Sequence, residues 1–244
     1  FGIGLLTGVV FLAPPPPASL LCQIQSRGYI LVGTSADYPP FEDYDATTDE
    51  FFGFDIDLSQ MIADALGVTL EMQDMDFDAL IGACAAGTID MVAAAMTYTA
   101  ERAAQLAASE VYITVTQVVI VRGDSTLTIS DLSDLSGYDV GCQSGTVMQD
   151  ELEDAGLTPT TFPRADVLIQ SLVVGDIDAA YVDGPIFDTW SKTEDLKVIY
   201  STDSEPLVLW CPIGEPELLA MIDKVILDAF EDGTMDDLYI EWFG

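Results

Sequence analysis

The feature that most constrains the fold of this chain is a regular alternation of short strand-like and helix-like segments after residue 28. Alternating apolar residues and β-branched runs predict strands, and apolar positions three and four residues apart predict helices. The segments are Tyr29–Thr34 (strand), Phe54–Leu66 (helix), Val68–Met72 (strand), Phe77–Ala86 (helix) and Asp90–Ala94 (strand). This order predicts an α/β fold with largely parallel sheets.

An internal repeat predicts two similar lobes. Leu80-Ile81 followed by Gly87-Thr88-Ile89-Asp90 recurs as Leu168-Ile169 followed by Gly175-Asp176-Ile177-Asp178 at identical spacing. Upstream, Val32–Ser35 is echoed by Val140–Gln143. Each half therefore contains a strand, a helix, a tight glycine turn and a second strand.

Two segments are expected to connect the lobes. The apolar, β-branched run Val111–Val121 is long for one strand and carries the chain out of the first lobe, and Leu207–Cys211 carries it back. Pro216–Asp232 is then a helix added to the first lobe. We expect discontinuous lobes, residues 26–115 plus 205–244 and residues 116–204, joined by two hinge segments.

The first 25 residues have a different character. Phe1–Ala13 is almost wholly apolar and is followed by the proline run Pro14–Pro17. A bilayer span needs about 20 residues, so this stretch is too short to cross a membrane. It fits the remnant of a signal sequence or an N-terminal membrane anchor, together with a Pro-rich linker. Both alternatives predict an exported protein, periplasmic or extracellular.

Charge is the most unusual part of the composition. Asp and Glu number 42 against 7 Lys and Arg, which gives a formal net charge of -35. At molar salt the screening length shrinks to about 3 Å, so such a coat fits a halophilic protein in a hypersaline medium. Cationic partners are the alternative. Nucleic acid is excluded as a partner, because it requires basic patches.

Several kinds of chemistry are excluded or disfavoured. The chain has no histidine, so Ser-His-Asp triads and His-bearing zinc sites are impossible. The acidic stretch Asp43–Glu50 lacks the Gly and Glu of a calcium-binding EF-hand, since Thr48 and Phe54 stand at those positions. We expect no metal and no cofactor. The four cysteines form no C-x-x-C pair and are expected to be buried apolar residues, with a disulfide between two of them as the alternative: Cys22, Cys84, Cys142 and Cys211.

The ligand site is expected between the lobes, because ligands of open α/β sheets bind beyond the carboxyl ends of strands. Four such ends are Ser35–Phe41, Ala94–Arg102, Gln143–Val147 and Val182–Gly184, two from each lobe. In the second of these, Thr99 is a plausible N-cap of a helix whose free N–H groups favour an anion. Arg102 in the same segment is suited to grip a carboxylate with two hydrogen bonds, unless it pairs with a surface acid.

The other strand ends supply further candidates. Gln143-Ser144-Gly145-Thr146 is a strand-to-helix turn in which Gly145 permits close approach and Thr146 offers a hydroxyl. Asp183 ends an apolar strand, where it is placed to hold an ammonium group. Tyr38, Phe41 and Phe54 are candidates for cleft walls, with core packing as the alternative for each.

As a set, these motifs resemble the signatures of a known family. The segments Gly33–Glu42, Gly53–Leu58, Thr97–Arg102, Gln143–Thr146, Glu231–Thr234 and Trp242–Gly244 are similar to those of the polar amino-acid substrate-binding proteins of ABC transporters, extracellular solute-binding protein family 3. The resemblance covers residues 26–244. It implies a two-lobed Venus-flytrap fold (periplasmic binding protein-like II) that closes over one free amino acid and delivers it to ABC permease subunits. We expect the protein itself to be a monomer.

The resemblance also implies roles for individual residues. The ligand carboxylate would meet Arg102, Thr97 and the Thr146 turn, and its ammonium would meet Asp183. The ligand side chain would lie against Tyr38 and Phe54, near Ser35, Asp37 and Gln143. Two positions depart from the family: Ala95 stands where many members have serine, so only its backbone can contribute, and Ser35 stands where many binders of basic amino acids have aspartate. The second departure argues against arginine or lysine, although Asp37 and Glu42 offer compensating charge.

Two other functions remain open. Periplasmic cyclohexadienyl dehydratases resemble this family, and an enzyme acting on prephenate or arogenate would need an acid or base that only Asp37 or Glu42 offers. A sensor domain detached from a receptor is the third possibility. No membrane helix follows Trp242-Phe243-Gly244, which argues against a sensor domain unless the chain is truncated at both ends. Between the other two, we expect a capture protein rather than an enzyme.

Overall fold

The computed structural model describes residues 18–244, so the expected signal or anchor in residues 1–17 lies outside the described residues. Residues 20–25 were assigned to the linker, and here the prediction is wrong. They belong to helix α1 (Leu20–Arg27), whose Ile24 is fully buried and which packs against the first lobe. Among residues 18–244, no helix is both long and apolar enough to cross a membrane.

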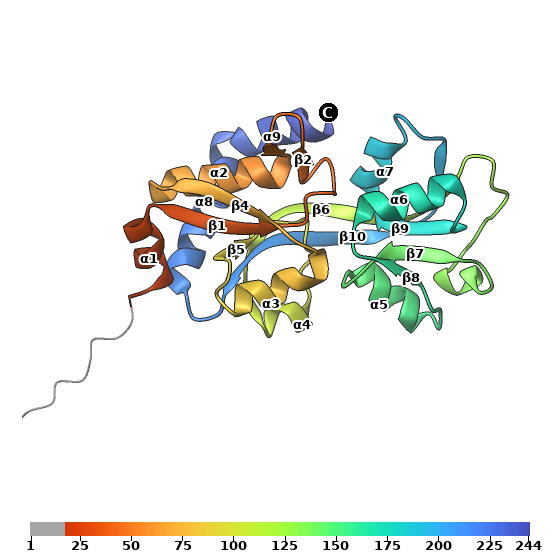
Figure 1. Ribbon diagram of the computed structural model, residues 1–244, viewed down its shortest axis with the longest axis horizontal. Coiled ribbons are helices and arrows are strands. Elements are labelled where there is room, and N and C mark those ends of the chain that lie inside the picture. Colours follow the sequence, from red (N-terminus) through yellow and green to blue (C-terminus); the bar gives the residue numbers. More distant parts are fainter. Residues whose placement is uncertain (1–17) are drawn as a thin grey trace, which may run out of the picture.

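One eight-stranded mixed sheet runs through the molecule, in the order β4-β1-β5-β10-β6-β9-β7-β8 (Figure 1). Its parallel pairs are β1/β4, β1/β5, β7/β8 and β7/β9. The strands are β1 (Tyr29–Thr34), β4 (Thr69–Asp74), β5 (Met91–Val92), β6 (Leu106–Arg122), β7 (Val140–Gln143), β8 (Thr160–Phe162), β9 (Ala179–Asp183) and β10 (Leu196–Pro212). A separate hairpin consists of β2 (Asp43–Asp45) and β3 (Glu50–Phe52).

Helices cover both faces of this sheet. In Figure 1, α2, α9, α6 and α7 lie on one side and α3, α4 and α5 on the other. The helices after α1 are α2 (Phe54–Leu66), α3 (Leu80–Ala85), α4 (Ala100–Ala103), α5 (Val147–Asp154), α6 (Ala165–Val174), α7 (Gly184–Trp190), α8 (Pro216–Asp232) and α9 (Thr234–Phe243), with 3-10 turns η1 (Phe77–Ala79) and η2 (Leu132–Leu135). The α/β prediction is confirmed.

Two long strands connect the two lobes. β6 and β10 are each 17 residues long and run antiparallel, from the pair Leu106–Pro212 to the pair Arg122–Leu196. At one end β10 pairs with β5, and at the other β6 pairs with β9. The first lobe contains β1, β4, β5, α1–α4, α8 and α9, and the second contains β7–β9 and α5–α7 (Figure 1). The expected lobe boundaries, 115/116 and 204/205, fall inside these strands, and placing them there stays a prediction.

The internal repeat has a structural counterpart in each lobe. A Cβ on Gly141 of β7 would lie 2.6 Å from Leu168 and 2.7 Å from Ile177, and a Cβ on Gly33 of β1 would collide with Leu80 and Ile89 in the same way. Glycine at these positions lets the repeated leucine and isoleucine pack directly on the strand. The repeated aspartates correspond too: Asp90 Oδ2 accepts from Leu31 N at 2.7 Å, and Asp178 Oδ2 accepts from Asp139 N at 3.0 Å.

Cysteines follow the sequence-based expectation in three of four cases. Cys84, Cys142 and Cys211 are buried and free, whereas Cys22 is free and exposed on α1. None of the four cysteines therefore forms the disulfide that was the alternative.

A candidate ligand site between the lobes

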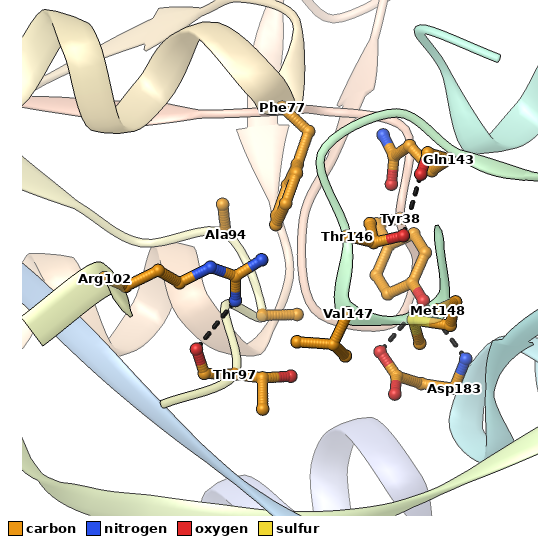
Figure 2. Close-up of a pocket in the computed structure, with 11 residues that line it drawn as sticks. Tyr38, Phe77, Ala94, Thr97, Arg102, Gln143, Thr146, Val147, Met148 and Asp183 are labelled. Atoms are coloured by element: carbon orange, nitrogen blue, oxygen red, sulfur yellow. Dashed lines mark hydrogen bonds between the residues drawn. The ribbon is translucent and has the colours of Figure 1, made fainter. Parts of the chain in front are cut away.

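A small cavity lies between the lobes and is lined by side chains from both of them (Figure 2). Its volume is about 10 Å³, room for about one water molecule. A larger ligand can enter only if the lobes separate or side chains rotate. The lining residues are Tyr38, Phe77, Ala94, Ala95, Thr97 and Arg102 from the first lobe, and Gln143, Thr146, Val147, Met148 and Asp183 from the second.

Arg102 supplies a buried positive charge to one wall. It is 6% exposed, and its backbone N–H donates to the N-cap side chain of Thr99, which places the residue in the first turn of α4. Nη1 donates to the Thr97 carbonyl at 2.7 Å, and Nη2 crosses to the Gly145 carbonyl at 3.0 Å. Burial lowers the pKa of Arg102 to about 10, so the guanidinium stays charged at neutral pH. It forms no salt bridge within residues 18–244, which rules out the surface-pair interpretation.

Asp183 supplies a carboxylate to the opposite wall, at the end of β9 (Figure 2). The residue is 3% exposed. Oδ2 accepts a hydrogen bond from the Tyr38 hydroxyl at 2.9 Å, whereas Oδ1 is buried without a partner among the described residues. Burial raises the pKa of Asp183 to about 7, although the Tyr38 hydrogen bond and the Arg102 charge lower it. A cationic group at Oδ1 would satisfy that oxygen and favour the ionised form.

The segment before Arg102 is held in an unusual conformation. Ala95 has φ 45, in the left-handed region that a non-glycine residue enters at a cost of about 1–3 kcal/mol. Its N–H donates to Asp55 Oδ2 at 2.8 Å, and the same oxygen accepts from the Tyr112 hydroxyl at 3.0 Å. Asp55 is fully buried at the start of α2. It therefore fixes the backbone of the cavity wall, a role that the sequence-based reading of the Gly53–Leu58 motif missed.

The second-lobe turn lies close against the first lobe. Gly145 has φ 74, and a Cβ there would lie 2.8 Å from Asp78 Cβ and 3.1 Å from Asp78 Cα, so glycine is required on two grounds. The Thr146 hydroxyl donates to the Gln143 carbonyl at 2.7 Å (Figure 2), and Thr146 also lines the cavity.

Ser35 and Asp37 lie outside the cavity and are connected to it through Gln143. Gln143 Nε2 contacts Ser35 Oγ at 3.4 Å, and Ser35 Oγ donates to Asp37 Oδ1 at 2.7 Å. Gln143 lines the cavity, but the other two do not. Burial raises the pKa of Asp37 to about 6, against the lowering effect of the Ser35 hydrogen bond and of Arg164.

The assignment of Phe54 to the cleft wall is wrong. Its ring is fully buried in an aromatic cluster, with ring centroids 5.7 Å from Tyr112 and 5.4 Å from both Tyr239 and Phe243. Phe77, rather than Phe54, is an aromatic residue that lines the cavity. The Arg102 guanidinium lies 5.6 Å from the centroid of its ring. A signal for Phe77 was present, because it follows β4 and so marks another strand end at the cleft.

Glu42 is buried behind Tyr38 rather than in the cavity. It is 1% exposed, and neither carboxylate oxygen has a partner among the described residues. Burial, and then the charge of Asp55, raise its pKa well above the ordinary value. Within residues 18–244, no group of acidic or cysteine side chains is arranged to hold a metal ion.

Two α/β lobes on paired hinge strands, with a cation on one wall of the cleft and a carboxylate on the other, define a two-lobed ligand-capture protein. The chain belongs to the bacterial extracellular solute-binding proteins, family 3, whose model matches residues 30–244.

Individual relatives agree with this membership. The arginine-binding extracellular protein ArtP of Bacillus subtilis is 30% identical over 88% of this chain and 86% of its own length. The L-cystine-binding protein TcyJ of Escherichia coli is 29% identical over 92% of this chain and 86% of its own.

Solved structures share the whole fold. A mutant of ArgBP from T. maritima superposes with a TM-score of 0.87 at 34% identity, over 91% of this chain and 98% of its own. The ancestral amino acid-binding protein AncCDT-1, a precursor of cyclohexadienyl dehydratase, has a TM-score of 0.87 at 33% identity, over 93% of this chain and 100% of its own. The Venus-flytrap expectation is thereby confirmed.

Proposed function

We propose that this chain binds one free polar amino acid between its lobes and delivers it to the permease subunits of an ABC importer. The observation that carries the proposal is the pairing of a buried Arg102 with a partly unsatisfied Asp183 on facing walls of one cavity. Every free α-amino acid has an anionic and a cationic end, so this pair suits the part of the ligand that all amino acids share.

The carboxylate of the ligand takes the place of the carbonyl acceptors that Arg102 now contacts. Because the guanidinium has five N–H donors and carries its charge at all relevant pH values, it binds a carboxylate more strongly than it binds Thr97 O or Gly145 O. The Thr97 side chain lines the same region and provides an additional donor, whereas the Thr146 hydroxyl already donates to the Gln143 carbonyl.

The ammonium of the ligand binds Asp183 Oδ1, the oxygen without a partner. The ligand side chain lies between Tyr38 and Phe77 and reaches toward Gln143, with Ser35 and Asp37 behind it. This surrounding is polar at its far end, which favours a polar side chain. Relatives whose names specify arginine and cystine support the class of ligand without deciding the member.

Closure is the mechanism of capture. A ligand that contacts both Arg102 and Asp183 stabilises the closed arrangement by the contacts that it makes only there. The closed surface is then recognised by the permease subunits. Family membership supports an exported protein, and we propose that it acts as a monomer.

We propose binding without catalysis. A dehydratase needs an acid or base over the substrate, and the two candidates, Asp37 and Glu42, lie outside the cavity lining. Asp183 lines the cavity, but its Oδ2 is engaged by Tyr38. The structural neighbour AncCDT-1 is itself described as an amino acid-binding protein.

A thermal-shift screen of the twenty amino acids, followed by calorimetric titration of the best candidates, tests this proposal. One amino acid bound per chain is expected, and no binding to any of them would contradict it. Incubation with prephenate and with arogenate is the second arm. We expect no aromatic product, and steady turnover would establish the enzymatic alternative instead.

A further inference from the structure

At one edge of the boundary between the lobes, an arginine of the second lobe contacts two carboxylates of the first. Arg164 immediately precedes α6, and its Nη1 donates to Asp74 Oδ1 at 2.8 Å. Nη2 donates to Asp74 Oδ2 and to the Ala36 carbonyl, each at 3.2 Å. Asp74 ends β4, so this two-pronged contact joins the last residue of a first-lobe strand to the N-cap residue of a second-lobe helix.

Asp37 completes the contact from the first lobe. Its Oδ2 lies 3.6 Å from Arg164 Nε and also accepts a hydrogen bond from the Ala165 N–H, the first helical residue of α6. The N-cap of α6 makes no side-chain cap of its own. A first-lobe carboxylate therefore caps a second-lobe helix, where an anion is favoured by the free N–H groups and the helix dipole.

These contacts depend on closure but not on a ligand. The partners are 90 and 128 residues apart in sequence and sit on separate lobes joined through β6 and β10, so separation of the lobes breaks all of them together. None of Arg164, Asp37 and Asp74 lines the cavity.

The contact is also electrostatically distinctive. With 42 acids against 7 bases, the two lobes repel each other on average. Within residues 18–244, the other salt bridges each stay inside one lobe, and those of Arg164 are the ones that cross the boundary. Arg164 thus offsets the repulsion at the point where the lobes meet.

We propose that Arg164, Asp37 and Asp74 form an interlobe clasp that stabilises the closed state and raises ligand affinity without contacting the ligand. The apparent dissociation constant of a protein that binds in one conformation equals the intrinsic constant divided by the fraction in that conformation. Weakening the clasp lowers the fraction of closed protein and therefore lowers the affinity for every ligand by the same factor. This inference goes beyond the proposed function, because it concerns the ligand-free equilibrium between open and closed lobes.

The test measures the distance between the lobes in the ligand-free protein. Spin labels are placed on two exposed sites, Asp64→Cys on α2 and Asp154→Cys on α5, after Cys22→Ser removes the exposed native thiol. Pulsed EPR then compares Arg164→Gln, which removes the charge, with Lys224→Gln as the matched control. Lys224 pairs with Asp228 inside α8, so its loss changes net charge equally without touching the boundary.

We expect Arg164→Gln to shift the distance distribution toward longer values and Lys224→Gln to leave it unchanged. Arg164→Lys is expected to restore part of the short-distance population. Calorimetry with two different amino acids should show an affinity loss of about tenfold for both, a size typical of a charge-assisted hydrogen bond. The difference between wild type and Arg164→Gln should shrink toward molar salt, as screening weakens the clasp.

Unchanged distances in a folded Arg164→Gln protein would overturn the proposal, as would an affinity loss confined to one ligand. If the Arg164→Gln protein fails to fold, Asp74→Asn is measured in its place, and we expect the same changes in interlobe distance and in affinity. An asparagine Oδ1 can keep the hydrogen bond from Ala36 N while the charge is lost. If no amino acid binds at all, the proposed function fails while the distances still decide on the clasp.

Discussion

The Tyr38 hydroxyl lies 2.9 Å from Asp183 Oδ2 and joins the two lobes at the wall of the cavity. It also accepts from the Asp183 backbone N–H at 3.1 Å, so one phenol satisfies two polar groups of the second lobe. Burial, and then the Asp183 charge, raise the pKa of Tyr38 well above its ordinary value, which keeps the phenol protonated as a donor. The hydroxyl thereby orients the carboxylate so that Oδ1 remains for a ligand.

Replacing Tyr38 by phenylalanine should therefore weaken amino-acid binding. The change leaves the Asp183 N–H and Oδ2 without their partner, and a buried group in that condition costs about 1–3 kcal/mol, or roughly ten- to a hundredfold in affinity. Calorimetry measures the loss. Tyr44→Phe, in the exposed hairpin, is the control. If the Tyr38→Phe variant bound the amino acid as tightly as the Tyr44→Phe variant does, Tyr38 would not orient Asp183.

Stability should fall as pH rises from about 4 to 7. Burial raises the pKa of Asp55 to about 7, of Asp183 to about 7 and of Asp37 to about 6. The folded protein therefore holds protons that the unfolded chain has already released, since an unperturbed Asp has a pKa near 3.9. The stabilisation from these carboxyls is fully present below the unfolded pKa and is lost as pH rises through the folded values.

Denaturant titrations between pH 4.5 and 7.5 measure this effect. The expected slope is at most about 1.4 kcal/mol per pH unit for each carboxyl. Asp55→Asn should flatten the curve, because the amide cannot titrate. A stability that rises across this pH range would mean that these groups are ionised in the folded protein.

Binding should release a proton near neutral pH. In the free protein Asp183 titrates at about 7, and a ligand ammonium beside Oδ1 favours the ionised carboxylate. Affinity is therefore expected to rise between pH 6 and 8. Calorimetry at pH 7 in two buffers of different ionisation enthalpy counts the protons, and no release would place the ammonium elsewhere.

Salt should stabilise the fold even though it weakens the clasp. The net charge of -35 opposes compaction, and molar salt reduces the screening length to about 3 Å. We expect the melting temperature in 3 M KCl to exceed that in 0.1 M KCl. A melting temperature that is unchanged or lower in 3 M KCl would argue against adaptation to high salt.

The sequence was sufficient to predict the parts of this molecule that leave a regular pattern. Gly33 and Gly141, with the leucine and isoleucine that pack on each, form the repeat that predicted two lobes. Arg102 and Asp183 were predicted from their positions at strand ends, and the structure brings both to one cavity.

Side-chain direction and closure could not be predicted in this way. Phe54 and Phe77 are both aromatic residues beside glycine- or acid-rich turns, and no local pattern distinguishes Phe54, which is buried in the core, from Phe77, which lines the cleft. The contacts of Arg164 join residues 90 or more positions apart across a hinge, so no local pattern marks them.

The most direct test of the account is a calorimetric comparison of wild type and Arg102→Gln, each titrated with the best-binding amino acid and with its α-carboxamide. If Arg102 binds the carboxylate, the variant should lose about a hundredfold or more in affinity for the amino acid, since removing one partner of a buried ion pair costs about 3–5 kcal/mol. The α-carboxamide, which lacks the charge, should bind wild type weakly and lose little further affinity. An Arg102→Gln protein that binds the amino acid as tightly as wild type would contradict the central claim.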